Sequence, residues 1–291
     1  MERVLVVGAG FMGSGIAQVS AQAGCQVHLM DIQPAITEKS LRDIRWSVEK
    51  LAAKGAIQEP PEHVLARISP ANDLSIAAKV DWVIEAVVEE EDLKLGLFQE
   101  LDRISQPQTL LATNTSSIPI TRLAASTRRP ERVLGLHFFG PVPLMQLVEV
   151  VKGEQTSRES FERGVSFVRS LGKTPVRVQR DIPGFVMNRI FSAAFREAVD
   201  LVDQGIVSAE DVDMGMRLGY GWNAGPFEIA DNAGLDTIAR IGKTLRALGA
   251  EQFVPRSNLI ERMVTEGRLG RKVGKGFYRY SPDGKRLPWE Q

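Results

Sequence analysis

The stretch Val4-Leu5-Val6-Val7-Gly8-Ala9-Gly10-Phe11-Met12-Gly13 determines how the first part of the chain folds. Four β-prone residues lead into a glycine-rich turn, and the run 14–23 that follows has helical character. Strand, glycine turn and helix in this order are typical of a dinucleotide site in an open α/β sheet. Gly8 permits the tight turn, Gly10 lets the backbone approach a pyrophosphate, and Gly13 lets the helix pack closely on the strand. The N-terminus of the helix then holds the phosphates.

Asp31 directly follows the next strand-like run, Gln26–Met30. It lies about twenty residues after the glycine turn, where such sites place an acid. A carboxylate there accepts hydrogen bonds from the adenosine ribose hydroxyls and repels a 2′-phosphate. The following Ile32-Gln33 supplies no arginine to neutralise such a phosphate. We therefore expect NAD rather than NADP. The predicted contacts in this region are Gly8, Gly10, Phe11, Met12, Gly13 and Asp31.

Strand-like runs at 3–7, 26–30, 80–86, 109–112, 133–139, 146–151 and 175–178 alternate with helical patterns. This alternation predicts a Rossmann-type, mostly parallel sheet with an antiparallel edge hairpin. The segment 34–67 is too long for a simple crossover and carries apolar residues on one helical face, so we expect an inserted helical hairpin there. Beyond Pro183 strand signals fade and helical patterns take over, at 185–203, 209–218, 236–248 and 259–266. We expect an NAD-binding domain over 1–182 and a smaller all-α domain for substrate binding and dimerisation over 183–291.

Composition restricts the possible partners. The 36 basic and 36 acidic residues cancel, so no overall field attracts nucleic acid or an anionic membrane. No apolar run approaches the roughly 20 residues that cross a bilayer, and because the first strand-like run begins at Arg3 we expect no signal peptide. A single cysteine, Cys25, forms no internal disulfide, and no cysteine and histidine cluster predicts a metal site. These features predict a cytoplasmic protein without a metal, a nucleic-acid partner or a membrane partner.

One of the three histidines stands in a context that suggests chemistry. His28 lies in a strand-like run and His63 in a polar helical stretch, whereas His137 ends an apolar run that only residues 138–145 separate from the next. So short a connection predicts antiparallel strands, and symmetry about the turn sets His137 opposite Glu149. A carboxylate-oriented imidazole is the general base that an alcohol needs to lose its proton as hydride departs. A structural ion pair in the sheet is the alternative.

Seven motifs, in order along nearly the whole chain, resemble those of the 3-hydroxyacyl-CoA dehydrogenases. They are Gly8-Ala9-Gly10-Phe11-Met12-Gly13-Ser14-Gly15-Ile16-Ala17, Val83-Ile84-Glu85-Ala86-Val87-Val88-Glu89, Asn114-Thr115-Ser116-Ser117, His137-Phe138-Phe139-Gly140-Pro141-Val142-Pro143, Pro183-Gly184-Phe185-Val186-Met187-Asn188-Arg189, Gly225-Pro226-Phe227-Glu228 and Gly274-Lys275-Gly276-Phe277-Tyr278. The resemblance implies reversible NAD-dependent oxidation of an (S)-3-hydroxyacyl-CoA, such as 3-hydroxybutyryl-CoA, to the 3-ketoacyl-CoA. Fatty-acid metabolism is one setting for such an enzyme.

The resemblance also implies roles for individual residues. His137 is the expected base and Glu149 its partner, while Ser116 and Asn188 are expected to contact the substrate oxygen and help position the base. Because Asn188 opens the second domain, the resemblance puts the active site in an interdomain cleft. Further cofactor contacts implied by the resemblance are Glu85, Lys94 and Asn114, and candidates for binding the coenzyme A phosphates are Arg42, Arg45 and Lys50. For these last three, a solvated helix face is the alternative.

Two motifs depart from the family pattern. Gly140 stands where the family usually has asparagine, which predicts a less well supported turn beside the base. Trp222-Asn223-Ala224 replaces an aromatic, proline and methionine, which leaves the acyl preference open. The alternatives in function are a dehydrogenase of a free hydroxy acid, of the L-gulonate or carnitine type, and a catalytically silent nicotinamide-binding protein. The apolar helices after Pro183 predict a homodimer joined through the second domain.

Overall fold

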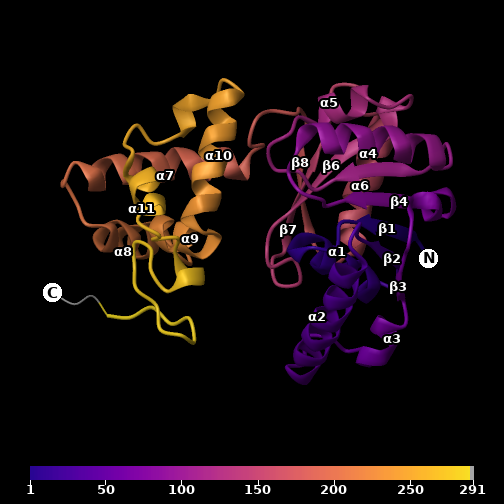
Figure 1. Ribbon diagram of the computed structural model, residues 1–291, viewed down its shortest axis with the longest axis horizontal. Coiled ribbons are helices and arrows are strands. Elements are labelled where there is room, and N and C mark those ends of the chain that lie inside the picture. The colour runs from indigo at the N-terminus through magenta and orange to yellow at the C-terminus, as the bar shows by residue number, and fades with distance from the viewer. Residues whose placement is uncertain (289–291) are drawn as a thin grey trace. The chain divides into compact units, whose positions relative to one another are not determined.

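The structure is a computed structural model that describes residues 1–288. Contacts within the chain divide it into two compact units, Met1–Phe185 and Val186–Gln291. The first unit is an α/β sheet structure and the second is helical (Figure 1). The predicted succession of a Rossmann-type domain and a smaller all-α domain is confirmed. The two units are described separately below.

The first unit contains one sheet of eight strands, in the order β3-β2-β1-β4-β5-β6-β7-β8. Every neighbouring pair is parallel except β6 and β7, which are antiparallel. The predicted antiparallel hairpin is therefore present, one strand in from the edge, because β8 pairs in parallel with β7. The strands are β1 (Arg3–Val7), β2 (Gln26–Met30), β3 (Ile68–Pro70), β4 (Trp82–Glu85), β5 (Leu110–Thr113), β6 (Val133–Phe138), β7 (Leu147–Val151) and β8 (Thr174–Val178).

Helices cover both faces of this sheet. One core cluster joins strand side chains such as Val6 and Ile84 to Ile16 of α1, Val48 of α2 and Phe161 of α6. On the other face, α4 and α5 lie over the sheet (Figure 1). The helices of this unit are α1 (Phe11–Gln22), α2 (Pro34–Ala53), α3 (Pro61–Leu65), α4 (Glu91–Ile104), α5 (Ile120–Ala125) and α6 (Arg158–Ser170), with 3-10 turns η1 (Leu74–Lys79) and η2 (Pro130–Arg132).

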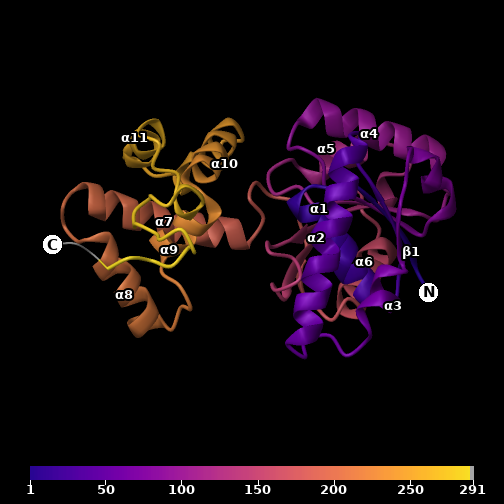
Figure 2. The ribbon, with the colours of Figure 1, turned by 60° about the horizontal axis from the view of Figure 1, so that its bottom comes forward.

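The inserted hairpin predicted over 34–67 is formed by α2 and α3. Pro34 occupies the first turn of α2, where its missing N–H costs no helical hydrogen bond. The inner face of α2 buries Ile44 and Val48 in the core cluster, so α2 lies along α1 (Figure 2). Its outer face is polar and exposed, and residues on the side between these two faces, among them Lys39, Ser47 and Lys50, line a pocket described below. The short strand β3 follows the hairpin and has no counterpart among the predicted strands.

The second unit is built from five α-helices within the described residues. Its core includes Phe195 of α7, Phe227 of α9, Met263 of α11 and the tail residues Phe277 and Tyr278. The elements are α7 (Met187–Asp203), α8 (Ala209–Tyr220), α9 (Pro226–Ala233), α10 (Leu235–Ala247), η3 (Glu251–Phe253), α11 (Leu259–Thr265) and η4 (Arg271–Val273). Four of these helices match predicted helical stretches. The eight-residue α9, which begins in the Gly225-Pro226 motif, was not predicted.

Candidate active site

The glycine turn after β1 has the geometry of a dinucleotide cradle. Gly8 has a φ of 99°, and a Cβ there would lie 2.5 Å from the carbonyl oxygen of Ala86. A Cβ on Gly13 would lie 1.7 Å from the carbonyl oxygen of Gly8, so only glycine lets α1 approach the turn so closely. At Gly10 a Cβ would meet nothing within 4 Å, and no side chain caps the helix that begins next to it. The open space at the N-terminus of α1 therefore fits a pyrophosphate.

Asp31 reaches the same turn from the end of β2. Its Oδ2 accepts a hydrogen bond of 2.9 Å from the Ala9 N–H, and its Oδ1 accepts one of 3.1 Å from the Gln33 N–H. These two bonds fix the carboxylate beside the glycine turn, and each oxygen keeps a second lone pair for a ribose hydroxyl. The Ser40 hydroxyl of α2 also donates to the carbonyl oxygen of Ala9. The turn is thus held from two sides without a side chain entering the space at Gly10.

A buried ion-pair cluster lies where β4 ends. The Lys94 ammonium is 2.9 Å from a carboxylate oxygen of Glu85 and 2.8 Å from one of Glu89, and only 1% of the Lys94 side chain is exposed. Glu85 has no exposed surface and also accepts from the Thr113 hydroxyl and the Val87 N–H, both at 2.7 Å. Glu85 thus holds Lys94 in place, and its expected contact with the cofactor stays a prediction.

Glu89 anchors the loop that carries Ser116. Its Oε1 accepts hydrogen bonds from the N–H groups of Ser116 and Ser117, at 3.1 and 3.2 Å, and from the hydroxyls of Thr115 and Ser117. Burial alone would raise the pKa of Glu89, but the Lys94 ammonium and these hydroxyls outweigh it, so the pKa lies below its usual value. Sequence reasoning did not select Glu89. The available signal was its place among the family motifs, four residues after Glu85.

His137 and Glu149 face each other across β6 and β7. The two residues are direct partners in the antiparallel register, and His137 Nδ1 lies 2.7 Å from Glu149 Oε2. Glu149 has no exposed surface and His137 is 6% exposed. The rings of Phe139 and Phe185 lie against the imidazole, with centroids 4.6 and 5.6 Å away. The register predicted from the turn is confirmed, and the pair is dry and firmly oriented.

The loop between these two strands is held by Lys173, which the sequence analysis did not consider. The buried Lys173 ammonium donates to the carbonyl oxygens of Val142 at 2.7 Å and Met145 at 2.6 Å, and burial lowers its pKa. The same loop contains Gly140, where the family usually has asparagine. A Cβ on Gly140 would lie 2.7 Å from a ring carbon of Phe11, so the glycine makes room for that ring. The loop beside the base is thus supported from its inner side.

The remaining predicted residues lie in different places. Asn114 follows β5, and its Oδ1 accepts a 2.9 Å hydrogen bond from the Phe138 N–H, which ties this loop to the strand of His137. Ser116 is half-buried in the same loop. The first unit therefore places Asn114 and Ser116 in the loop after β5, next to β6, which carries His137 near its carboxyl end. Asn188 is the second residue of α7 in the other unit, and its part in the site remains a prediction.

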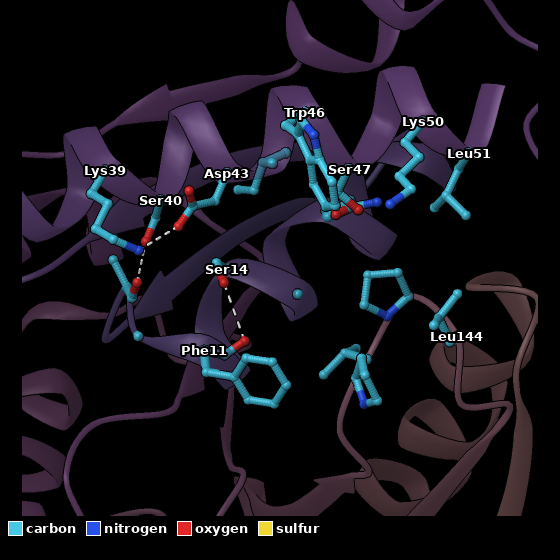
Figure 3. Close-up of a pocket in the computed structure, with 18 of the residues that line it drawn as sticks. Phe11, Ser14, Lys39, Ser40, Asp43, Trp46, Ser47, Lys50, Leu51 and Leu144 are labelled. Carbon is cyan, nitrogen blue, oxygen red and sulfur yellow. Dashed lines mark hydrogen bonds and ion pairs between the residues drawn. The ribbon is translucent and has the colours of Figure 1, made fainter. Parts of the chain in front are cut away.

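A pocket of about 620 Å³ lies between α1, α2 and the loop 141–144 (Figure 3). Of the three basic residues predicted to bind the acyl carrier, Lys50 lines this pocket. Arg42 and Arg45 are exposed on α2 but are not part of the pocket wall, and Arg45 lies 3.9 Å from Glu49. The structure adds wall residues that the sequence analysis did not select, namely Lys39, Trp46, Ser47 and Lys54.

Within residues 1–288, no group of three or more histidine, cysteine, aspartate or glutamate side chains is arranged to hold a metal ion. Within the same residues, no helix has the length and apolar character needed to cross a membrane.

Comparison with known proteins identifies both units. Residues 3–182 match the family model described as the NAD-binding domain of 3-hydroxyacyl-CoA dehydrogenase, and residues 184–280 match its C-terminal domain. A probable 3-hydroxybutyryl-CoA dehydrogenase of Deinococcus radiodurans is 45% identical over 276 residues, covering 94% of this chain and 99% of that protein. A Bacillus subtilis protein of the same description is 42% identical over 282 residues, covering 96% and 98%.

A solved structure gives the same result. The (S)-3-hydroxybutyryl-CoA dehydrogenase of Ralstonia eutropha superposes with a TM-score of 0.90 at 40% identity, covering 97% of this chain and 99% of that one. The family models together match both units. The NAD that the first family model names also agrees with the geometry of the glycine turn and Asp31. The chain therefore belongs to the 3-hydroxyacyl-CoA dehydrogenase family, as an NAD-dependent oxidoreductase.

Proposed function

We propose that this enzyme reversibly oxidises the 3-hydroxyl of a short (S)-3-hydroxyacyl-CoA, such as 3-hydroxybutyryl-CoA, with His137 as general base and Glu149 as its orienting partner. The observation that carries the proposal is the 2.7 Å contact between His137 Nδ1 and Glu149 Oε2 across an antiparallel pair. Nδ1 of the neutral ring then carries the hydrogen, and Nε2 keeps the lone pair. Nε2 is therefore the atom that takes the proton of the alcohol.

The chemical step balances with these groups. The glycine turn and Asp31 would hold NAD, which would supply the hydride acceptor for C3 of the substrate. The O–H proton passes to His137 Nε2 as the C3–O bond becomes a carbonyl, and the carboxylate of Glu149 stabilises the imidazolium that forms. In the reverse direction the imidazolium returns this proton to the oxygen. Oxidation thus requires the neutral ring and reduction the protonated one.

Ser116 and Asn188 are proposed to contact the substrate oxygen. Support for Ser116 comes from its place after β5, at the sheet edge where ligands of such folds bind, and from the anchoring of its loop by Glu89. Support for Asn188 comes from its position in a family motif at the start of α7. Lys94 is proposed to act at the nicotinamide ribose, held by Glu85 and Glu89.

The nucleotide end of coenzyme A is proposed to occupy the pocket between α1, α2 and the loop 141–144. Three lysines and one aspartate line it, so a polyanion is favoured there over a neutral ligand. Among the described residues neither Lys50 nor Lys54 forms an ion pair with a carboxylate, whereas Lys39 is 2.6 Å from Asp43. Lys50 and Lys54 therefore replace Arg42 and Arg45 as the proposed phosphate ligands.

We further propose that the domain over 183–291 joins two copies into a homodimer, and that the protein works in the cytoplasm. Support for the dimer comes from large apolar side chains exposed on the second unit, among them Ile206, Leu218 and Tyr220, which are 64%, 83% and 80% exposed. Light scattering at micromolar concentration tests the dimer, and a monomer would contradict it.

A substrate panel tests the proposed activity. NADH consumption is measured with acetoacetyl-CoA, and NAD reduction with 3-hydroxybutyryl-CoA, L-gulonate and carnitine. The proposal predicts turnover of both thioesters and none of the free acids, and the opposite preference would contradict it. The same assays with NADP and NADPH test Asp31: a carboxylate beside the ribose should make NAD strongly preferred, and equal efficiency with both cofactors would contradict that role.

A further inference from the structure

The pocket between α1, α2 and the loop 141–144 contains one side chain that the phosphates of an acyl carrier do not explain. Trp46 is 62% exposed, although it belongs to the wall of this pocket. Figure 3 shows its ring extending from α2 on the side of the pocket opposite Phe11. Phe11 is itself 69% exposed and begins α1 beside the glycine turn. Two exposed aromatic rings therefore border a cavity whose remaining wall includes lysines.

The indole is held in a defined position. The Lys50 ammonium lies 4.3 Å from the centroid of the Trp46 ring, a cation–π contact between residues four apart on α2. This contact occupies one face of the indole, which leaves the other for a ligand. A lysine ammonium has three donors, so Lys50 can contact the ring and a phosphate together. Trp46, Lys50 and Lys54 follow at intervals of four residues along one helix face.

An oriented aromatic ring next to unpaired lysines matches a nucleotide more closely than any other part of an acyl thioester. An aromatic side chain stacks on a base whatever its hydrogen-bonding edge, and ammonium groups bind phosphates. The pantetheine arm has neither a flat ring nor a charge, and the acyl group of a short substrate is small and apolar. The indole and the lysines thus favour the adenine and the phosphates of the carrier.

We propose that Trp46 is a specificity-determining residue that stacks on the adenine ring of coenzyme A, with Lys50 and Lys54 binding the adjoining phosphates. This inference rests on the proposed acyl-CoA substrate and goes beyond it. It makes the affinity for the carrier depend on one indole, in a pocket whose wall does not include His137, and leaves the chemical step independent of that indole. Trp46 should therefore affect KM for the thioester and not kcat.

The test compares Trp46→Ala, Trp46→Phe and the control Glu49→Ala, an exposed position of α2 outside the pocket wall. Because alanine is the best helix former, the substitution at an exposed site keeps α2 folded. Each variant is assayed with acetoacetyl-CoA and with acetoacetyl-pantetheine, which lacks the nucleotide. Binding of adenosine 3′,5′-bisphosphate is measured separately by calorimetry, without NAD or turnover.

We expect Trp46→Ala to raise KM for acetoacetyl-CoA by roughly 5-fold to 150-fold, the range of one lost stacking contact, with kcat unchanged. Binding of the bisphosphate should weaken by a similar factor, and KM for acetoacetyl-pantetheine should not change. Trp46→Phe should recover most of the affinity for the nucleotide. An equal loss with both thioesters would assign Trp46 to structure, and no loss with either would overturn the proposal. If wild-type protein turns over neither thioester, the proposed function fails, while bisphosphate binding still decides whether Trp46 holds a nucleotide.

Discussion

Glu149 in the first unit and Asp231 in the second are both carboxylates with no exposed surface, yet their partners differ in kind. Glu149 faces the imidazole of His137, a side chain that can gain and lose a proton. Asp231 accepts hydrogen bonds of 2.9 Å from the N–H groups of Phe277 and Tyr278, and one of 3.0 Å from the Tyr280 hydroxyl. The partners of Asp231 are therefore two backbone amides and the Tyr280 phenol. Burial and the nearby Asp231 raise the pKa of this phenol above its usual value.

The difference separates a carboxylate that serves chemistry from one that serves folding. Burial is costly for both and needs compensation. At Asp231 the compensation comes from donors of the chain segment after η4, so this carboxylate fastens the tail of the second unit onto α9. Asp213 does the same for the start of α9 through the N–H groups of Phe227 and Glu228. At Glu149 the compensation for burial comes from His137. The second nitrogen of that imidazole is available for a substrate proton, so the same contact serves both burial and the proposed chemistry.

The largest expected effect follows from removing the base. His137→Gln should lower the rate of acetoacetyl-CoA reduction by roughly 100-fold to 10,000-fold, the usual contribution of general acid–base catalysis. NADH binding, followed by fluorescence titration, should change little, because His137 is not part of the glycine turn. His63→Gln, which changes an exposed histidine of α3, is the matched control. Near-normal turnover of His137→Gln would show that this pair is structural, like Asp231.

Removing the fastening carboxylate should affect folding instead. Asp231→Ala leaves two buried N–H groups without their acceptor, which should lower the free energy of unfolding by roughly 2–5 kcal/mol, measured by urea denaturation. Asp236→Ala is the control, because Asp236 pairs with Lys272 at a half-exposed site and such pairs contribute about 1 kcal/mol or less. A loss of turnover in Asp231→Ala beyond its unfolded fraction would contradict the division between the two carboxylates.

Replacing the orienting carboxylate should have an intermediate effect. Glu149→Gln keeps the shape and an acceptor oxygen but removes the charge that stabilises the imidazolium, so turnover should fall by roughly 10-fold to 100-fold. Ketone reduction, which uses the protonated ring, should lose more than oxidation. Rates measured in both directions check this. Equal losses in the two directions would mean that Glu149 orients the ring without stabilising its charge.

Glu89 combines the two kinds of partner found at Glu149 and Asp231. It contacts the Lys94 ammonium, and it accepts hydrogen bonds from backbone N–H groups of the Ser116 loop. Its folded pKa lies below the ordinary glutamate value of 4.5, so its ionised form stabilises the fold above that pH, and the stabilisation is lost as pH falls through the folded pKa. Glu89→Gln should therefore destabilise the protein by about 1 kcal/mol at neutral pH and reduce its acid sensitivity. Equal acid sensitivity of variant and wild type in urea unfolding would contradict this.

Local sequence accounts for much of the fold. β1 and β2 have the predicted bounds, because each is a short apolar run ended by a glycine or an acid. The hairpin register was predictable because a short antiparallel connection leaves one symmetric pairing. The three-residue β3 was missed, since a strand this short forms through its pairing with β2 and not through its own pattern. The eight-residue α9 was missed for a similar reason, as Asp213 and the tail complete it.

By itself, the sequence determined the cofactor class, through the glycine turn and Asp31, and the pairing of His137 with Glu149, through turn symmetry. Both depend on spacing within one strand–turn–strand or strand–turn–helix segment. Tertiary structure alone decided that Glu85 lies beneath Lys94, that Lys173 holds the loop beside the base, and that Trp46 and Lys50 border a pocket while Arg42 and Arg45 do not. The reason is that burial and side-chain direction are set by elements distant in sequence, and no local pattern records what packs against a residue from elsewhere in the chain.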